Sequence, residues 1–111
     1  MAIFITQARL SQEAVKNIVA RPEDRFAAVE KLVAAAGGKL LHYYATTGEY
    51  DVLLISEAPD GADAVIAGMA AAATGTVSHI VTVRAWNSSE FKTMAERAQK
   101  VLASYRAPGT A

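Results

Sequence analysis

The chain has no cysteine among its 111 residues. Disulfides, thiolate nucleophiles and metal sites built on cysteine are therefore excluded. Neither sign of charge is in excess, because 11 basic residues balance 11 acidic ones and the formal net charge is zero. A neutral chain has no bulk attraction for phosphate backbones or anionic lipid, so we expect neither nucleic acid nor a membrane as a partner.

A continuous apolar segment long enough for a membrane is also lacking. The stretch from Ala64 to Val83 carries no formal charge and has the length of a bilayer span. Gly68, Ser78 and His79 interrupt it, and alanine supplies much of the rest, so a helix, a turn and a strand explain it better. The first residues lack the basic and apolar segments of a signal peptide. We expect a soluble and, by default, cytoplasmic protein.

The residues that are present favour one packed domain over residues 1–111. Apolar residues make up 52% of the chain and charged residues 20%, a balance typical of a folded core. Apolar periodicity and turn residues predict four strands and four helical segments. The strands are expected over residues 3–9, 39–46, 51–58 and 76–86, and the helices after Ser11, from Pro22 to Ala36, over residues 62–73 and from a Ser88 or Ser89 cap onward.

This order, with the first two helical segments in one connection, matches a ferredoxin-like α+β fold with an extra C-terminal helix. We expect a four-stranded antiparallel sheet with its first and third strands in the middle. Asp60 and Asp63 resemble a capping box, Gly37 is placed to end a helix, and Glu96 with Lys100 is spaced as an ion pair. Residues 106–111 are expected to form a frayed tail.

The strands are apolar on both faces. Residues 52–55 point two large side chains each way, and strand 3–9 has Ile3 and Ile5 on one side and Phe4 on the other. Leaving one such face wet would forgo burial on the order of 6–15 kcal/mol. A second copy related by a twofold axis is therefore expected to cover it. The alternative is that the C-terminal helix folds back across this face.

Several motifs resemble those of the GYD-domain family, over roughly residues 3–95. They are Gly48-Glu49-Tyr50-Asp51, Gly37-Gly38-Lys39, Tyr43-Tyr44, Glu57-Ala58-Pro59-Asp60 and Arg84-Ala85-Trp86 followed by Glu90-Phe91. The chain departs from the family at Leu10-Ser11, where members often carry Trp-Thr, and at Trp86, where they often carry Phe. The resemblance implies a dimeric α+β barrel but no particular reaction, since the wider superfamily includes monooxygenases, isomerases and haem-handling proteins.

The Gly48–Asp51 motif has two interpretations. In the structural one, Gly48 adopts a positive φ, Asp51 accepts backbone amides and Tyr50 shields the turn. In the functional one, Tyr50 and Asp51 line a mouth of the barrel and hold a polar group of a ligand.

The only two histidines, His42 and His79, lie on strands expected at opposite edges of the sheet. His42 is expected to share a face with Leu40 and Tyr44, and His79 with the valines of its strand. Across a dimer they could meet as acid and base or as haem ligands, although a hydrogen-bonded core or interface role is commoner. No ligand spacing supports a metal site. Tyr43 and Tyr44 should point to opposite faces, and Tyr44 is the better candidate to contact a ligand.

Arg84 and Trp86 are expected on the most polar face of the fourth strand, with Ser78, Ile80 and Thr82. Arg84 could bind an anionic ligand or form an ion pair with Glu57 or Asp51, and the ion pair is favoured because a partly buried arginine normally finds a carboxylate.

Together these features predict a homodimer, or a higher oligomer of dimers, whose barrel interior binds a small apolar organic molecule. No cofactor is predicted, with haem as the alternative. The chain could instead be a cofactor-independent isomerase or monooxygenase-like enzyme using His42 and Tyr44, or a non-catalytic assembly module. A cavity larger than about 300 Å³ favours a ligand, and a filled interior favours the module.

Overall fold

The computed structural model describes residues 1–109 of the chain. Four strands form one antiparallel sheet in the order β2-β3-β1-β4, so the first and third strands occupy the middle as predicted. The strands are β1 (Ala2–Leu10), β2 (Lys39–Ala45), β3 (Val52–Ala58) and β4 (Val77–Ala85).

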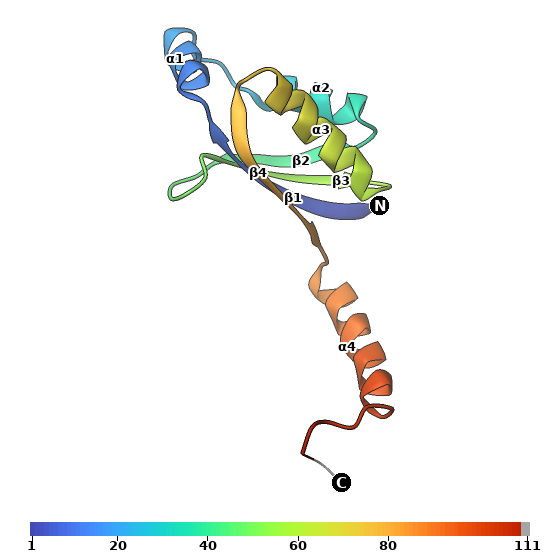
Figure 1. Cartoon of the computed structure of the whole chain (residues 1–111). Helices are drawn as coiled ribbons and strands as arrows, with labels where there is room; N and C mark the ends of the chain where they lie inside the picture. Colours follow the sequence, from blue (N-terminus) through green and yellow to red (C-terminus); the bar gives the residue numbers. More distant parts are fainter. Residues whose placement is uncertain (110–111) are drawn as a thin grey trace.

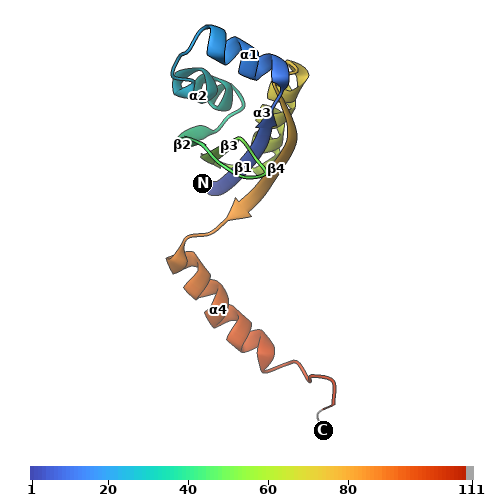
Figure 2. The same ribbon diagram turned by 90° about the vertical axis from the view of Figure 1, so that its left-hand side faces the viewer.

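Three helices, α1 (Gln12–Ala20), α2 (Phe26–Ala35) and α3 (Gly61–Ala73), lie on one side of this sheet (Figure 1). The fourth, α4 (Ser88–Leu102), extends away from the sheet beyond the end of β4 in both views (Figures 1 and 2). The ferredoxin-like α+β arrangement with an additional C-terminal helix is thus confirmed. Because α4 projects, the molecule measures 67 × 29 × 22 Å.

The helix ends agree with the predictions from the sequence at some positions and differ from them at others. The capping box of Asp60 and Asp63 at the start of α3 is confirmed. The cap of α4 is Asn87 and not a serine: its Oδ1 accepts from the Glu90 amide at 2.7 Å, and Glu90 Oε1 accepts from the Asn87 amide at 3.0 Å. Asparagine caps a helix as well as serine does, so residue type alone did not identify the first residue of α4.

The connection between α1 and α2 is longer than predicted. Pro22 lies in this linker and not in the first turn of α2, which begins at Phe26. The Asp24 side chain accepts a hydrogen bond from the Phe26 amide at 2.9 Å and so satisfies a free donor at the start of the helix. At the other end, Gly37 has a φ of +99°, which confirms a glycine stop.

The last helix also differs in detail. Glu96 forms its ion pair with Lys92 at 3.9 Å instead of with Lys100. Both lysines lie four residues from Glu96, one on each side, so spacing alone left the choice open. The helix ends at Leu102, before the predicted tail, and residues 110–111 of that tail lie outside the described residues.

A β-bulge in β2 changes which of its side chains share a face. Leu40 pairs with Ser56 but His42 pairs with Ile55, so Leu41 is the extra residue. Leu40 therefore points toward the helices, and His42 points to the other face. The prediction that His42 shares a face with Leu40 was wrong, because one inserted residue reverses the alternation that follows it.

A second bulge lies in β4. Ser78 pairs with Arg9 and Val81 with Gln7, so two residues of β4 stand opposite Ala8. One of them, His79, has a φ of +52°, which is unusual for a residue with a side chain. Past the bulge, β4 has two distinct sets of side chains. Ile80, Thr82 and Arg84 point toward the helices, whereas Val81 and Val83 point away from them, so grouping Ser78 with Ile80, and His79 with Val77 and the later valines, was wrong.

The two faces of the sheet therefore meet different surroundings. We call the side under α1, α2 and α3 the covered face, and the other side, which carries Ile3, Ile5, Leu53, Ile55, Val81 and Val83, the open face. Val81 and Val83 are 41% and 50% exposed. Since α4 points away, the alternative in which it folds back over the open face does not describe this chain.

Candidate functional site: a cavity between the helices and the sheet

A cavity of about 1000 Å³ lies between the helices and the covered face. Its floor comes from β1, β3, Tyr43 of β2 and the first residues of β4, and its walls from α1, α2 and α3. Short side chains explain why this space is left. The wall formed by α3 consists largely of Ala64, Ala67, Gly68 and Ala71, and Ala8 and Ala58 of the floor are equally small.

Most side chains that line the cavity are apolar, among them Val33, Val52, Leu54 and Ile80. Polar and charged residues interrupt this lining, among them Asn17, Ser56 and Asp63. Thr6 is already engaged, since its hydroxyl lies 3.0 Å from that of Thr82.

The phenol of Tyr43 is the polar group of most chemical interest. Burial raises its pKa above the ordinary value, and the positive charge of Arg25 opposes this shift only in part. Tyr43 is therefore neutral at physiological pH and can donate a hydrogen bond into the cavity that it lines.

The linker between α1 and α2 borders the same cavity with Arg21, Pro22, Glu23 and Arg25. Arg25 and Glu23 form an exposed ion pair at 2.6 Å, so part of the charge at this rim is balanced. None of these residues was a candidate from the sequence. The available signal in the sequence was the alanine-rich stretch of α3, whose short side chains leave space beside the sheet.

The Gly48–Asp51 motif lies at one end of the sheet and joins β3 to β1. Asp51 Oδ2 accepts from the Leu10 amide at 2.8 Å, and the Asp51 amide donates to the Ala8 carbonyl at 3.0 Å. Gly48 has a φ of +96°. These contacts are those of the structural interpretation, in which the motif fixes a turn.

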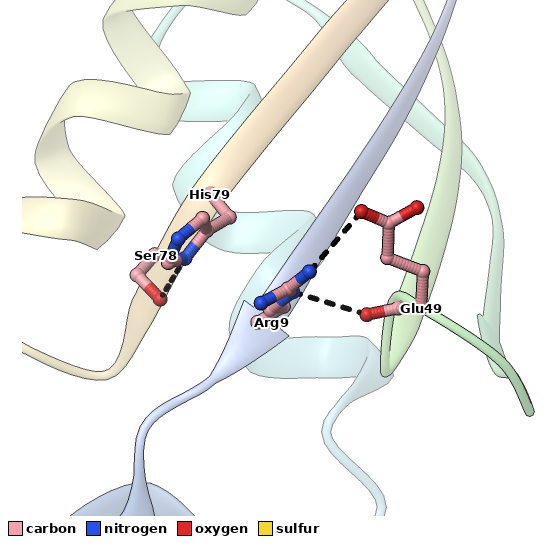
Figure 3. A network of polar contacts seen from close by, with 4 residues as sticks. All are labelled: Arg9, Glu49, Ser78 and His79. Carbon is pink, nitrogen blue, oxygen red and sulfur yellow. Dashed lines mark hydrogen bonds and ion pairs between the residues drawn. The ribbon is translucent and has the colours of Figure 1, made fainter.

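Arg9 reinforces this turn from β1. Its guanidinium contacts both the side chain and the carbonyl of Glu49 at 3.1 Å (Figure 3). The same guanidinium lies 6.0 Å from the ring centroid of Tyr50. Tyr50 and Asp51 are thereby held beside the end of β1, and neither lines the cavity.

His42 and Tyr44 lie together on the open face. Their rings are stacked with centroids 5.9 Å apart, and the Tyr44 hydroxyl is 3.4 Å from His42 Nδ1. The sheet separates this pair from the cavity, which is lined by Tyr43 from the same strand. Any chemistry of His42 and Tyr44 would therefore act on a molecule at the open face.

His79 lies at the opposite edge of the sheet, on β4, where its Nδ1 is 3.0 Å from the Ser78 hydroxyl (Figure 3). The two histidines are not brought together within one chain. In the described part of the chain, no group of three or more His, Cys, Asp or Glu side chains could hold a metal ion.

Arg84 contacts aromatic rings. Its guanidinium carbon lies 4.5 Å from the ring centroid of Trp86 and 5.9 Å from that of Phe4, and Nη1 donates to the Ala85 carbonyl. Within residues 1–109 it forms no ion pair, so the predicted pair with Glu57 or Asp51 was wrong. The register explains this result: Arg84 stands beside Phe4 on the covered face, Glu57 stands opposite Ile3 on the open face, and Asp51 lies at the far end of β1.

Comparison with known proteins places the chain in a family. The model of the GYD domain matches residues 4–95, which include the Gly48–Asp51 motif. The chain belongs to the GYD domain family. No protein of curated function matches this GYD chain. In the part of the chain that the structure describes, no helix is long and apolar enough to cross a membrane.

Two solved structures are similar in fold. The protein TTHA0845 from Thermus thermophilus is 16% identical with a TM-score of 0.51, over 79% of this chain and 96% of its own. FFRP-DM1 is 15% identical with a TM-score of 0.47, over 78% of this chain and 100% of its own. The likeness to TTHA0845 shows the fold alone and carries no activity to this chain.

Proposed function

We propose that this GYD protein is a homodimer that binds a small, largely apolar organic molecule in the cavity under its helices. The observation that carries the proposal is the volume of about 1000 Å³ between the helices and the covered face. Pockets that enclose small organic ligands have about 300–1000 Å³ and are mostly apolar with a few polar groups. This site therefore differs from the barrel interior that the sequence suggested.

The lining also indicates the chemistry of the ligand. Valine, leucine, isoleucine and alanine side chains favour a hydrocarbon or aromatic body. The neutral phenol of Tyr43 favours a hydrogen-bond acceptor on that body, such as a carbonyl or ether oxygen. An uncharged molecule fits best, because a charge placed among these side chains would be costly to desolvate.

The open face supports the dimer. Its central large side chains are only partly covered, and Val81 and Val83 of the edge strand remain about half exposed. A second copy that presents the same face through a twofold axis would bury both faces at once. The cavities would then lie on the outer sides of the pair, where ligands can reach them.

A second candidate function uses the open face. The contact of 3.4 Å between the Tyr44 hydroxyl and His42 Nδ1 favours proton transfer to a molecule held between the two copies. If this enzyme-like function holds, His42→Ala and Tyr44→Phe would each abolish turnover of such a molecule without changing binding in the cavity.

The test of the main proposal fills the cavity. N-phenyl-1-naphthylamine, an uncharged apolar dye, is titrated into the protein and followed by its fluorescence. In a variant with Ala67→Phe and Ala71→Phe, we expect affinity to fall at least tenfold, because both side chains line the cavity. The control carries Ala27→Phe and Ala34→Phe, which are exposed on α2 and do not line it. Equal affinity in both variants would overturn the proposal.

A further inference from the structure

The outer surface of α3 is unusual for a helix that faces water. Every exposed residue of α3 is apolar: Ala62, Val65, Ile66, Met69, Ala70, Ala72 and Ala73. Val65, Ile66 and Met69 are 54%, 52% and 67% exposed. A surface helix normally presents charged or polar residues on this side, and one that is apolar all round is normally buried.

The same chain carries a second uncovered apolar surface, on α4. All residues from 91 to 102 are exposed, including Phe91 at 66% and Val101 at 65%. Phe91, Met94, Ala98 and Val101 recur at helical spacing, and Tyr105 follows in the next turn. A helix of 15 residues without tertiary packing is marginal in water, so α4 needs a surface to pack against.

We infer that α4 of one copy packs against the outer face of α3 in a second copy, and that the exchange is reciprocal. The two surfaces complement each other, since each is an apolar strip along one helix. A reciprocal exchange closes with twofold symmetry and leaves neither strip uncovered.

The area is sufficient for a stable contact. Eight large side chains on the two helices and just after α4 are at least 40% exposed: Val65, Ile66, Met69, Phe91, Met94, Val101, Leu102 and Tyr105. At on the order of 100 Å² each, they present about 800 Å² per copy, which is what each partner contributes to a standard protein interface.

Charge favours an antiparallel arrangement. Arg97 and Lys100 lie in the C-terminal half of α4 and, among the described residues, have no ion-pair partner. The exposed acidic residue Asp60 lies at the start of α3. Antiparallel packing brings these basic and acidic residues together and leaves the uncharged middle of α3 against Met94 and Ala98.

The junction between β4 and α4 explains why the partner is another copy. Only Trp86 and Asn87 join the two elements, and both are held in place. The Trp86 ring stacks on Arg84 at 4.5 Å, and Asn87 forms both hydrogen bonds of the capping box with Glu90. This junction directs α4 away from the α3 of its own chain (Figures 1 and 2).

The absence of cysteine allows a clean crosslinking test. Single variants Met94→Cys and either Ile66→Cys or Met69→Cys are mixed under oxidising conditions. We expect a mixed disulfide, which requires contact between two chains. Met94→Cys mixed with Val19→Cys, an exposed position on α1, is the control and should give little product. No mixed product at either α3 position, or a disulfide formed only within one doubly substituted chain, would overturn the inference.

The contact between α4 and α3 involves neither the cavity nor the open face. The same crosslinking reaction can therefore distinguish this contact from the other two sites. We expect the mixed disulfide to form equally in the background with Ala67→Phe and Ala71→Phe, where dye binding is lost. It should also persist with Val83→Asp, which disrupts the open face. Loss of the product with Val83→Asp would contradict a direct contact between α4 and α3.

Discussion

The two faces of the sheet differ in what covers them, and around the cavity the covered face also carries short side chains. On the covered face, Ala8, Ser56 and Ala58 lie under helices and are buried, yet they fill little space. On the open face, Leu53 and Ile55 are large, and the described residues place no helix over them. Small side chains beneath the helices leave a cavity for a ligand. Large apolar side chains without a helix over them are buried only when another protein chain packs on them. The cavity on the covered face thus indicates a site for a small molecule, and the exposed large side chains of the open face indicate a contact with another protein chain.

The largest effect is expected from a charge on the open face. Val83→Asp places a carboxylate where the second copy would pack on the open face. In a background where Met69→Asp disrupts the contact between α4 and α3, we expect Val83→Asp to lower the remaining dimer affinity at least 100-fold, because an unpaired charge is costly to bury. Sedimentation equilibrium measures this. The control is Val19→Asp, since Val19 is also exposed but lies on α1. A wild-type chain that sediments as a single 11.7 kDa species would contradict the open-face contact.

A smaller effect, on the free energy of unfolding, is expected at the turn where Asp51 holds β3 beside β1. Asp51→Ala removes the acceptor of the Leu10 amide, and we expect the free energy of unfolding to fall by about 1.5–3 kcal/mol, as for hydrogen bonds to charged groups. Urea denaturation checks this value. Glu49→Ala removes only the exposed ion pair with Arg9, which is worth at most about 1 kcal/mol. Equal losses in the two variants would show that Asp51 has no special role in the turn.

The smallest effect concerns the pH dependence of folding stability, through Tyr43 in the cavity lining. Because burial raises the pKa of Tyr43 in the folded chain, the unfolded chain releases this proton first as pH rises. Stability contributed by the neutral phenol is therefore complete below about pH 10, the ordinary tyrosine pKa, and is lost as pH rises further. Tyr43→Phe should lose less stability than the wild type as pH rises above about 10. Identical pH profiles for wild type and Tyr43→Phe would contradict this.

The sequence predicted the elements of this fold but not all of their faces. Apolar alternation and turn residues located every strand within two residues, and Asp60 and Gly37 marked true helix ends. The bulges at Leu41 and beside His79 were not predictable from the sequence. Whether a strand holds an extra residue depends on how it pairs with its neighbour and not on local propensity. Each bulge reversed the side chains beyond it, which is why the groupings of His42 and of Ser78 failed.

The cavity was not predictable for a related reason. Its volume depends on small residues that are far apart in the chain, such as Ala8, Ala58 and Ala67, and on how closely α3 approaches the sheet. Helical or strand periodicity identifies a buried side but not whether that side is filled. The uncovered open face, in contrast, follows from strand pattern alone, since large apolar residues point both ways from β3.

The most direct test of the account uses two neighbouring leucines. Leu54 lines the cavity, and Leu53 stands opposite Gln7 on the open face. Methyl NMR spectra recorded during titration with N-phenyl-1-naphthylamine report on both residues in one experiment. The account predicts shifts of the Leu54 methyl signals and unchanged Leu53 signals. Shifts confined to Leu53 would place the ligand on the open face and contradict the cavity as the binding site.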